Sequence, residues 1–240
     1  MSDVVSYTVK DGVAIIQITR ADKLNALDEE VIQGLRSAFM QYDASEERCA
    51  ILCAEGDRAF SVGADIKNPP KEMWQGVPGV GVVTNKPIIA VVQGYCVGGA
   101  YILVQMCDLV VAADNTIFKY PEAQVGFTGG LIAGCAARIP HKIAMEFMLL
   151  GQDLPAQRAY EVGMVNMVGA AMGPIHPDGV THGAAQHFMH GHAQRLGLDI
   201  NQRVFNRANR ARRRADRHAP ATPSDIFDHR LHISRVLADQ

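Results

Sequence analysis

Short, almost continuously apolar runs constrain the fold of this chain more than any other feature. Two of them cover residues 87–92 and 109–113, and a third covers residues 50–54. Strands that are buried on both faces have this composition, and they belong to parallel sheets whose faces are covered by helices. We therefore expect an α/β fold in which strands alternate with helices through right-handed crossovers.

The segments around these runs carry hairpin and helix signals. Asp11 and Gly12 separate two strand-like segments, 6–9 and 13–18, and Asp-Gly is a preferred hairpin turn. A helix is expected to open at residues 25–28, because apolar residues then recur at helical spacing at Val31, Leu35 and Phe39. Further helices are expected over 103–106, over 131–137, over 142–150 with Gly151 as the stop, and from Pro155 through Tyr160.

Composition narrows the class of protein. With 240 residues and 48% hydrophobic content, the chain can form one large domain, or a domain with an appendage. Neither a signal peptide nor an apolar run of membrane-spanning length is recognisable, so we expect no membrane partner. The five cysteines have no metal-like spacing and favour a reducing cytoplasm, with no metal site. A net charge of −2 favours no nucleic-acid partner.

Charge is distributed unevenly along the chain. Residues 1–168 contain 13 Lys and Arg against 19 Asp and Glu, whereas residues 169–240 contain 10 Arg and 6 Asp. The second segment also holds eight of the nine His and no Lys. This break predicts a boundary near residue 168, followed by an atypical Arg- and His-rich segment, 169–240, that we expect to be helical. A divergent natural tail and a shifted reading frame would both give such a composition.

Two glycine-rich turns are candidates for binding. One spans residues 59–67 around Gly63, and the other spans residues 94–100 around Gly98 and Gly99. Each follows an apolar strand, and each is expected to precede a helix, where backbone N–H groups lack partners. Two such groups that converge on one oxygen form an oxyanion hole. Either turn alone is also explained by sterics, because strand–glycine–helix junctions are common.

The two turns in this order, followed later in the sequence by Pro121 and Glu122, resemble the motifs of the crotonase (enoyl-CoA hydratase/isomerase) superfamily. The resemblance covers about residues 5–168 and is carried by residues 24–27, 60–67, 86–94, 98–99, 107–108, 118, 121–122 and 150–151. It implies a spiral core of ββα units, to which this chain would add the helical C-terminal appendage. It also implies that the core, residues 1–168, binds an acyl-CoA thioester.

The resemblance also implies roles for individual residues. The N–H groups of Ala64 and Gly99 would form the oxyanion hole, and Glu122 would be the catalytic acid and base. The substrate-binding residues would be Lys23, Leu24, Ala26, Val62, Asp65, Ile66, Ile102 and Gly130. Coenzyme A enters as part of the substrate, so no separate cofactor is implied. The implied assembly is a homotrimer or hexamer.

Ile102 departs from the pattern of the family's hydratases, which carry one Glu at this position and a second where this chain has Glu122. Two carboxylates can position a water molecule and deliver a proton, whereas one can shuttle a proton between the α and γ carbons of an acyl chain. We therefore expect an enoyl-CoA isomerase. The alternatives are an enoyl-CoA hydratase or carnitinyl-CoA-type dehydratase, and a non-catalytic CoA-binding or scaffold protein.

Four further side chains near these motifs have structural explanations. Asp65 is expected to cap a helix after the first turn. Tyr101 and Tyr120 are expected to pack with their hydroxyl groups hydrogen-bonded. Trp74 either covers the acyl pocket or anchors an exposed loop. Prolines and glycines between residues 67 and 86 disfavour a long helix in that stretch.

Overall fold

The chain enters the fold through the predicted hairpin. The structure is a computed structural model that describes residues 3–10, 12–127 and 129–171, all within one structural unit. Strand β1 (Val5–Lys10) pairs antiparallel with β2 (Val13–Ile18), and Gly12 takes the positive φ of 74° that the turn requires. The hairpin prediction is therefore confirmed.

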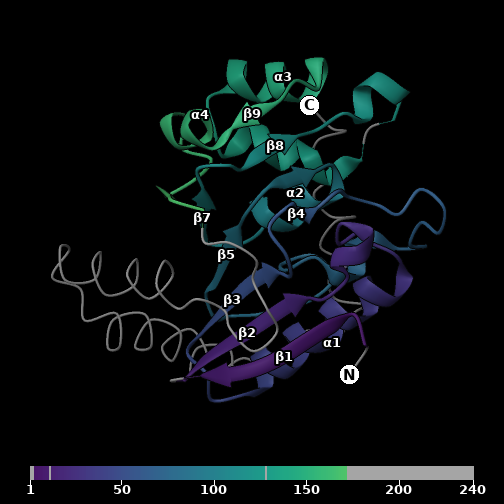
Figure 1. Ribbon diagram of the computed structural model, residues 1–240, viewed down its shortest axis with the longest axis vertical. Coiled ribbons are helices and arrows are strands. Elements are labelled where there is room, and N and C mark those ends of the chain that lie inside the picture. Colours follow the sequence, from purple (N-terminus) through teal and green to yellow (C-terminus); the bar gives the residue numbers. More distant parts are fainter. Residues whose placement is uncertain (1–2, 11, 128, 172–240) are drawn as a thin grey trace, which may run out of the picture. The chain divides into compact units, whose positions relative to one another are not determined.

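The hairpin forms one edge of a six-stranded sheet. The remaining strands are β3 (Cys49–Ala54), β5 (Ile88–Val92), β7 (Leu109–Ala113) and β10 (Met167–Gly169). Their order is β1-β2-β3-β5-β7-β10, and every pair from β2 onward is parallel. All three apolar runs of the sequence lie in this sheet, as predicted (Figure 1).

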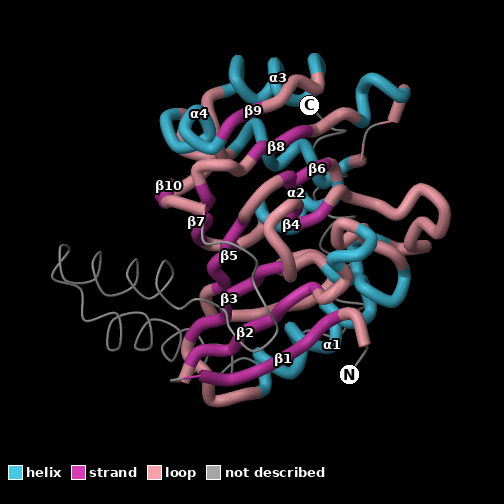
Figure 2. Tube along the Cα trace, in the orientation of Figure 1, coloured by secondary structure: helices cyan, strands magenta, loops and turns pink. Residues whose placement is uncertain are grey.

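A second, four-stranded sheet contains shorter strands. It has the order β4-β6-β8-β9, formed by β4 (Ala59–Ser61), β6 (Tyr95–Val97), β8 (Ile117–Lys119) and β9 (Leu154–Pro155). The pairs β4–β6 and β6–β8 are parallel, and β9 is antiparallel to β8. Three strands of the first sheet are each followed by a short strand of the second, β3 by β4, β5 by β6 and β7 by β8 (Figure 2). This alternation is the expected spiral of ββα units.

The first helix illustrates how sequence and packing agree. Helix α1 (Glu29–Ala44) begins after Asp28, whose side chain accepts a hydrogen bond of 3.0 Å from the Val31 N–H. Its predicted stripe of Val31, Leu35 and Phe39 is fully buried, and α1 packs along β1 and β2. The stripe therefore fixes which face of the helix meets the sheet.

The other helices follow their local signals with one difference. Helix α3 (His141–Leu150) ends at Gly151, which has a left-handed φ of 59°, and α4 (Ala156–Glu161) begins directly after Pro155. The helix expected over 131–137 is instead a 3₁₀ helix, η4 (Gly130–Ala137). Its two buried residues, Ile132 and Cys135, are three apart, which matches the three-residue turn of a 3₁₀ helix.

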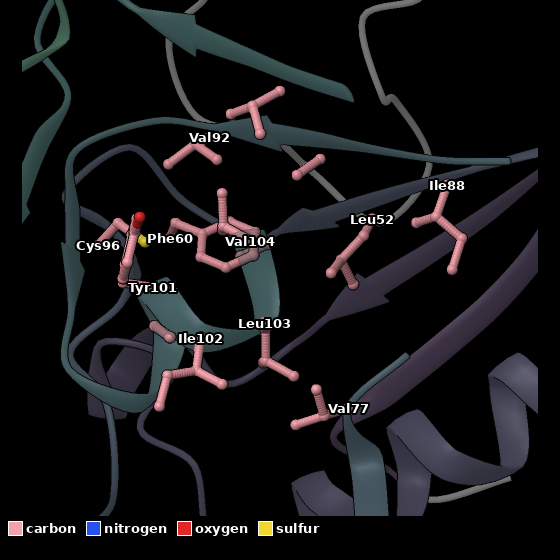
Figure 3. Close-up of a cluster of buried hydrophobic side chains, with 14 of the residues drawn as sticks. Leu52, Phe60, Val77, Ile88, Val92, Cys96, Tyr101, Ile102, Leu103 and Val104 are labelled. Atoms are coloured by element: carbon pink, nitrogen blue, oxygen red, sulfur yellow. The ribbon is translucent and has the colours of Figure 1, made fainter. Parts of the chain in front are cut away.

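Helix α2 (Gly99–Gln105) lies at the centre of the core. All seven of its residues are buried, so it has no solvent-facing stripe. Figure 3 shows its side chains packed with apolar residues from other elements, and the labelled set is Leu52, Phe60, Val77, Ile88, Val92, Cys96, Tyr101, Ile102, Leu103 and Val104. A helix that is mostly apolar and buried on every side is held by packing all around it.

One local prediction is wrong. No helix follows the first glycine-rich turn, and Asp65 instead closes a turn, because its Oδ1 accepts hydrogen bonds from the N–H groups of Lys67 and Asn68 at 3.0 and 3.3 Å. Pro69 and Pro70 then prevent helical continuation. As predicted, the stretch from 67 to 86 contains no long helix, only the 3₁₀ helix η2 (Met73–Gly76).

Two further predictions concern the C-terminal segment and membrane-spanning helices. The helices expected in the segment 169–240 lie outside the described residues from position 172 onward. Within the described part of the chain, no helix is both long and apolar enough to cross a membrane.

Candidate active site

Three parallel strands of the smaller sheet end beside one another. Strand β4 ends at Ser61 and leads into Gly63, β6 ends at Val97 and leads into Gly98, and β8 ends at Lys119, shortly before the 3₁₀ helix η3 (Glu122–Val125). Because β4, β6 and β8 are parallel, their carboxyl ends lie at the same edge of the sheet. Ligands of α/β proteins bind at such edges.

The first turn presents the N–H group of Ala64. Leu27 N–H donates to the Gly63 carbonyl at 2.8 Å, and Asp65 N–H donates to the Leu27 carbonyl at 2.9 Å. These two hydrogen bonds use backbone groups of Gly63 and Asp65, the neighbours of Ala64. The N–H of Ala64 itself therefore points away from Leu27. Ala64 is exposed, and its N–H has no backbone acceptor among the described residues.

The second turn presents the N–H group of Gly99. Gly99 is the first residue of α2, so its N–H has no acceptor within the helix, and no side chain caps it. The two turns are in contact, because a Cβ atom placed on Gly63 would lie 3.4 Å from the Gly99 nitrogen. The same Cβ would lie 2.7 Å from the Val97 carbonyl oxygen, so only glycine fits at position 63.

Glu122 directs its carboxyl group at the second turn. A Cβ atom placed on Gly98, which has a φ of 57°, would lie 2.5 Å from Glu122 Oε1. The other oxygen, Oε2, is buried and has no hydrogen-bond partner among the described residues. Burial raises the pKa of the Glu122 carboxyl above its usual value, and a backbone hydrogen bond of Glu122 itself opposes this rise. A carboxyl with one unpaired oxygen and a raised pKa is suited to accepting and returning a proton.

The loop between β2 and α1 contacts the first turn. Its residues Leu24 and Asn25 have positive φ values of 52° and 55°, which are uncommon outside glycine. Asn25 holds this shape, because its side chain donates to the carbonyls of Glu55 and Ala59 at 2.9 Å and accepts from the Arg20 N–H at 3.0 Å. The Leu24 carbonyl then accepts from the Val62 N–H at 3.2 Å. Backbone strain of this kind is common at binding sites.

The other residues predicted to bind substrate differ in their exposure. Lys23 is exposed, and Ala26 is buried in the loop beside the first turn. Ile66 is 95% exposed, and Gly130 is exposed at the start of η4 with open space around it. Ile102 is 6% exposed in the main core, one helical turn after Gly99.

Two residues near the turns were missed by the sequence reasoning. Met73, from η2, packs its thioether against Gly99, in the space that a side chain at position 99 would fill. Arg20 forms ion pairs with Asp28 and Asp65. The only local signal for Met73 was that it directly precedes Trp74, for which a place over the acyl pocket was one of two expectations. No local signal identified Arg20.

The aromatic side chains have structural roles. The Tyr101 hydroxyl donates to Cys135 Sγ at 3.3 Å, and the Tyr120 hydroxyl accepts from the Gly129 N–H at 3.4 Å, as predicted. Trp74 is 45% exposed and donates from Nε1 to Glu72, two residues earlier, which favours an exposed loop anchor. Burial is the main cause of the raised pKa of Tyr120, and the charge of Glu122 adds to it.

Two sheets built from alternating strands, with two glycine turns at one edge, define a crotonase-type fold. A family model described as enoyl-CoA hydratase/isomerase matches residues 8–175 of this chain. The chain belongs to the enoyl-CoA hydratase/isomerase family.

Individual relatives agree with this assignment. A protein of Dictyostelium discoideum named probable enoyl-CoA hydratase, mitochondrial, is 32% identical over 180 residues, which are 68% of this chain and 63% of that protein. The match therefore spans less than two thirds of the relative's length. A solved structure of an enoyl-CoA hydratase from Mycobacterium tuberculosis has a TM-score of 0.69 and 28% identity, covering 96% of this chain and 88% of the other. A probable enoyl-CoA hydratase/isomerase from Mycobacterium abscessus gives the same score and identity over 97% and 89%.

Proposed function

We propose that this chain is an acyl-CoA enzyme that stabilises the enolate of a thioester, with Glu122 as its acid and base. The observation that carries the proposal is the meeting of three groups at Gly98 and Gly99. The carboxyl of Glu122 contacts Gly98, the Gly99 N–H has no partner among the described residues, and the first turn approaches the Gly99 nitrogen through Gly63.

The chemistry follows from these groups. Removal of a proton from the α carbon of a thioester places negative charge on the carbonyl oxygen. Two fixed N–H donors, Ala64 and Gly99, would stabilise that oxyanion by roughly 3–4 kcal/mol each. Carbon acids are weak, so a positioned base is also needed, and it contributes about 10²–10⁴-fold to the rate. We assign that role to Glu122.

Double-bond migration suits a site with one carboxylate. Glu122 takes a proton from the α carbon of a 3-enoyl thioester, and the electrons of that C–H bond move into a dienolate held by the two N–H groups. The protonated Glu122 then returns the proton to the γ carbon, which yields the 2-enoyl thioester and restores the carboxylate. The apolar Ile102 in place of a second acid favours this reaction.

Hydration is the second candidate, because the 32% identical relative is named a probable enoyl-CoA hydratase. In that reaction Glu122 takes a proton from water, the hydroxide adds to the β carbon, and the proton returns to the α carbon. Dehydration, including that of a carnitinyl-type thioester, is the reverse.

An absorbance assay tests the proposal. A 3-enoyl-CoA gains the absorbance of the conjugated thioester on isomerisation, and a 2-enoyl-CoA loses it on hydration. We expect the first change to dominate, and Glu122→Gln to slow it by about 10²–10⁴-fold while acyl-CoA binding persists. Glu146→Gln is the matched control, because Glu146 is an exposed acid on α3. Binding without turnover of either ester would indicate a non-catalytic CoA-binding protein.

We also propose a homotrimer, either alone or paired into a hexamer, on the basis of family membership. Light scattering on the full chain tests this assembly, and a monomer at micromolar concentration would contradict it.

A further inference from the structure

The guanidinium group of Arg20 joins two carboxylates from separate segments. Its Nη2 lies 2.9 Å from Asp28 Oδ2, and its Nη1 lies 3.0 Å from Asp65 Oδ2. Nη1 also donates to the Ala26 carbonyl at 2.9 Å. The three charged side chains are only 16%, 8% and 17% exposed, so solvent and salt screen these contacts less than they screen surface ion pairs.

Both carboxylates have a second structural task. Asp28 caps the start of α1 through its bond to the Val31 N–H. Asp65 follows Ala64 directly and closes the turn over Lys67 and Asn68. Arg20 therefore ties the start of α1 to the turn that contains Ala64.

The backbone around Ala64 leaves it little freedom while this link holds. Gly63 and Asp65, its two neighbours, are both hydrogen-bonded to Leu27. Leu27 belongs to the loop that Arg20 closes through the Ala26 carbonyl and Asp28. A shift of this loop would consequently move the Ala64 N–H relative to the Gly99 N–H on the other turn.

We propose that Arg20 is a positioning residue that sets the direction of the Ala64 N–H toward the thioester oxygen. This inference rests on the proposed function. Arg20 touches neither the substrate nor the reacting atoms. It acts through Asp65 on one side of Ala64 and through Ala26 and Asp28 on the loop that holds Ala64. Displacement of a reacting group by 1 Å can lower a rate by roughly 10²-fold, so a small movement of this donor is sufficient to matter.

The arginine side chain suits this task for a geometric reason. A guanidinium presents several N–H donors in a rigid plane, so it can contact two carboxylates and a carbonyl at once. A lysine at the same position keeps the charge but offers a single, mobile ammonium group. We therefore expect Arg20→Lys to retain only part of the effect.

The test measures oxyanion stabilisation separately from ordinary binding. The probes are a 3-oxoacyl-CoA, whose enolate places negative charge on oxygen, and a saturated acyl-CoA of the same length. The parent chain is expected to bind the 3-oxoacyl ester more tightly and to increase the absorbance of its enolate. Arg20→Gln and Asp65→Asn are each expected to reduce this preference by about tenfold or more, with Arg20→Lys between them and the parent.

The control uses an ion pair away from the site. Arg158 pairs with Glu161 at 3.1 Å on the exposed surface of α4, so Arg158→Gln should leave the preference unchanged. If Arg20→Gln and Asp65→Asn fold and keep the preference and enolate absorbance of the parent within twofold, the positioning role is overturned. If Arg20→Gln does not fold, Asp65→Asn decides the same question. If the parent binds neither ester, the proposed function itself fails. This outcome differs from failure of the positioning role, which is judged only from variants compared with a parent that binds.

Discussion

The two turns that present the backbone donors are stabilised by different forces. Gly99 begins a helix whose seven residues are all buried, so its position follows from hydrophobic packing. Ala64 is exposed, and its turn is held by hydrogen bonds to Leu27 and by the ion pair of Arg20 with Asp65. Two turns with similar glycine-rich sequences are therefore held in place by different interactions. One donor depends on the core, and the other depends on polar contacts along its loop.

Gly63→Ala should disturb this arrangement most. Gly63 has a φ of 86°, and a new Cβ would lie 2.7 Å from the backbone oxygen of Val97, which cannot move without the strand. We expect a loss of roughly 2–6 kcal/mol in the free energy of unfolding, from the left-handed strain and the clash together. Denaturant unfolding measures it. Gly12→Ala is the control, because Gly12 also has a positive φ but open space around it, and its cost should stay near 1 kcal/mol.

Gly98→Ala should separate activity from stability. The atom that a new Cβ would meet is Glu122 Oε1, the end of a flexible side chain. The carboxyl can move aside, so the free energy of unfolding should fall only by about 1–3 kcal/mol from backbone strain. Turnover should fall by about 10²-fold or more, because the base is displaced. If kcat/KM stays within a few-fold of the parent in a folded variant, the position of the Glu122 carboxyl does not limit the reaction.

Ile102→Glu tests the packed side of the comparison. Ile102 is buried in the core, so we expect the free energy of unfolding at neutral pH to fall by about 2–4 kcal/mol. Burial should raise the pKa of the new carboxyl, so this loss should grow as the pH rises through that value. Hydration relative to isomerisation should increase if the new carboxyl shares a water with Glu122. Ile102→Gln is the uncharged control. A variant that folds, binds ligand and gains no hydration would show that Ile102 does not suppress that reaction.

The pH dependence of Glu122 should give the smallest effect. Its folded-state pKa is raised by burial, so the folded protein holds a proton there that the unfolded chain has already released. This contribution to stability is present at low pH and is lost as pH rises through the raised pKa. The free energy of unfolding of Glu122→Gln, taken relative to that of the parent, should therefore be higher at pH 8 than at pH 4. The difference should be less than about 1 kcal/mol, because the Glu122 side chain is partly exposed. Parallel unfolding curves at the two pH values would contradict the raised pKa. The kcat/KM of the parent should rise through the same pKa.

The sequence predicted the parts of this molecule that depend on local pattern. The apolar runs gave the interior strands, and the left-handed glycine at position 151 gave the end of α3. The helix expected after Ala64 fails because Asp65 offers the backbone a competing turn and two prolines follow. Arg20 could not be identified, because its partner Asp65 is 45 residues away and nothing at position 20 indicates that contact. The roles assigned to Ala64, Gly99 and Glu122 remain predictions.

The parallel arrangement of β4, β6 and β8 has a consequence for how such a chain can change length. Each of these strands delivers one functional group to the shared edge, and the strand pairing sets where that group emerges. The chain between one strand and the next only has to return to the opposite end of the sheet. Insertions and deletions in those returning segments, such as the stretch from 67 to 86, can therefore accumulate without moving the two turns or Glu122. Length variation should then reshape the surface around this edge of the sheet, and, under the proposed function, change which acyl groups bind, while the two turns and Glu122 stay in place.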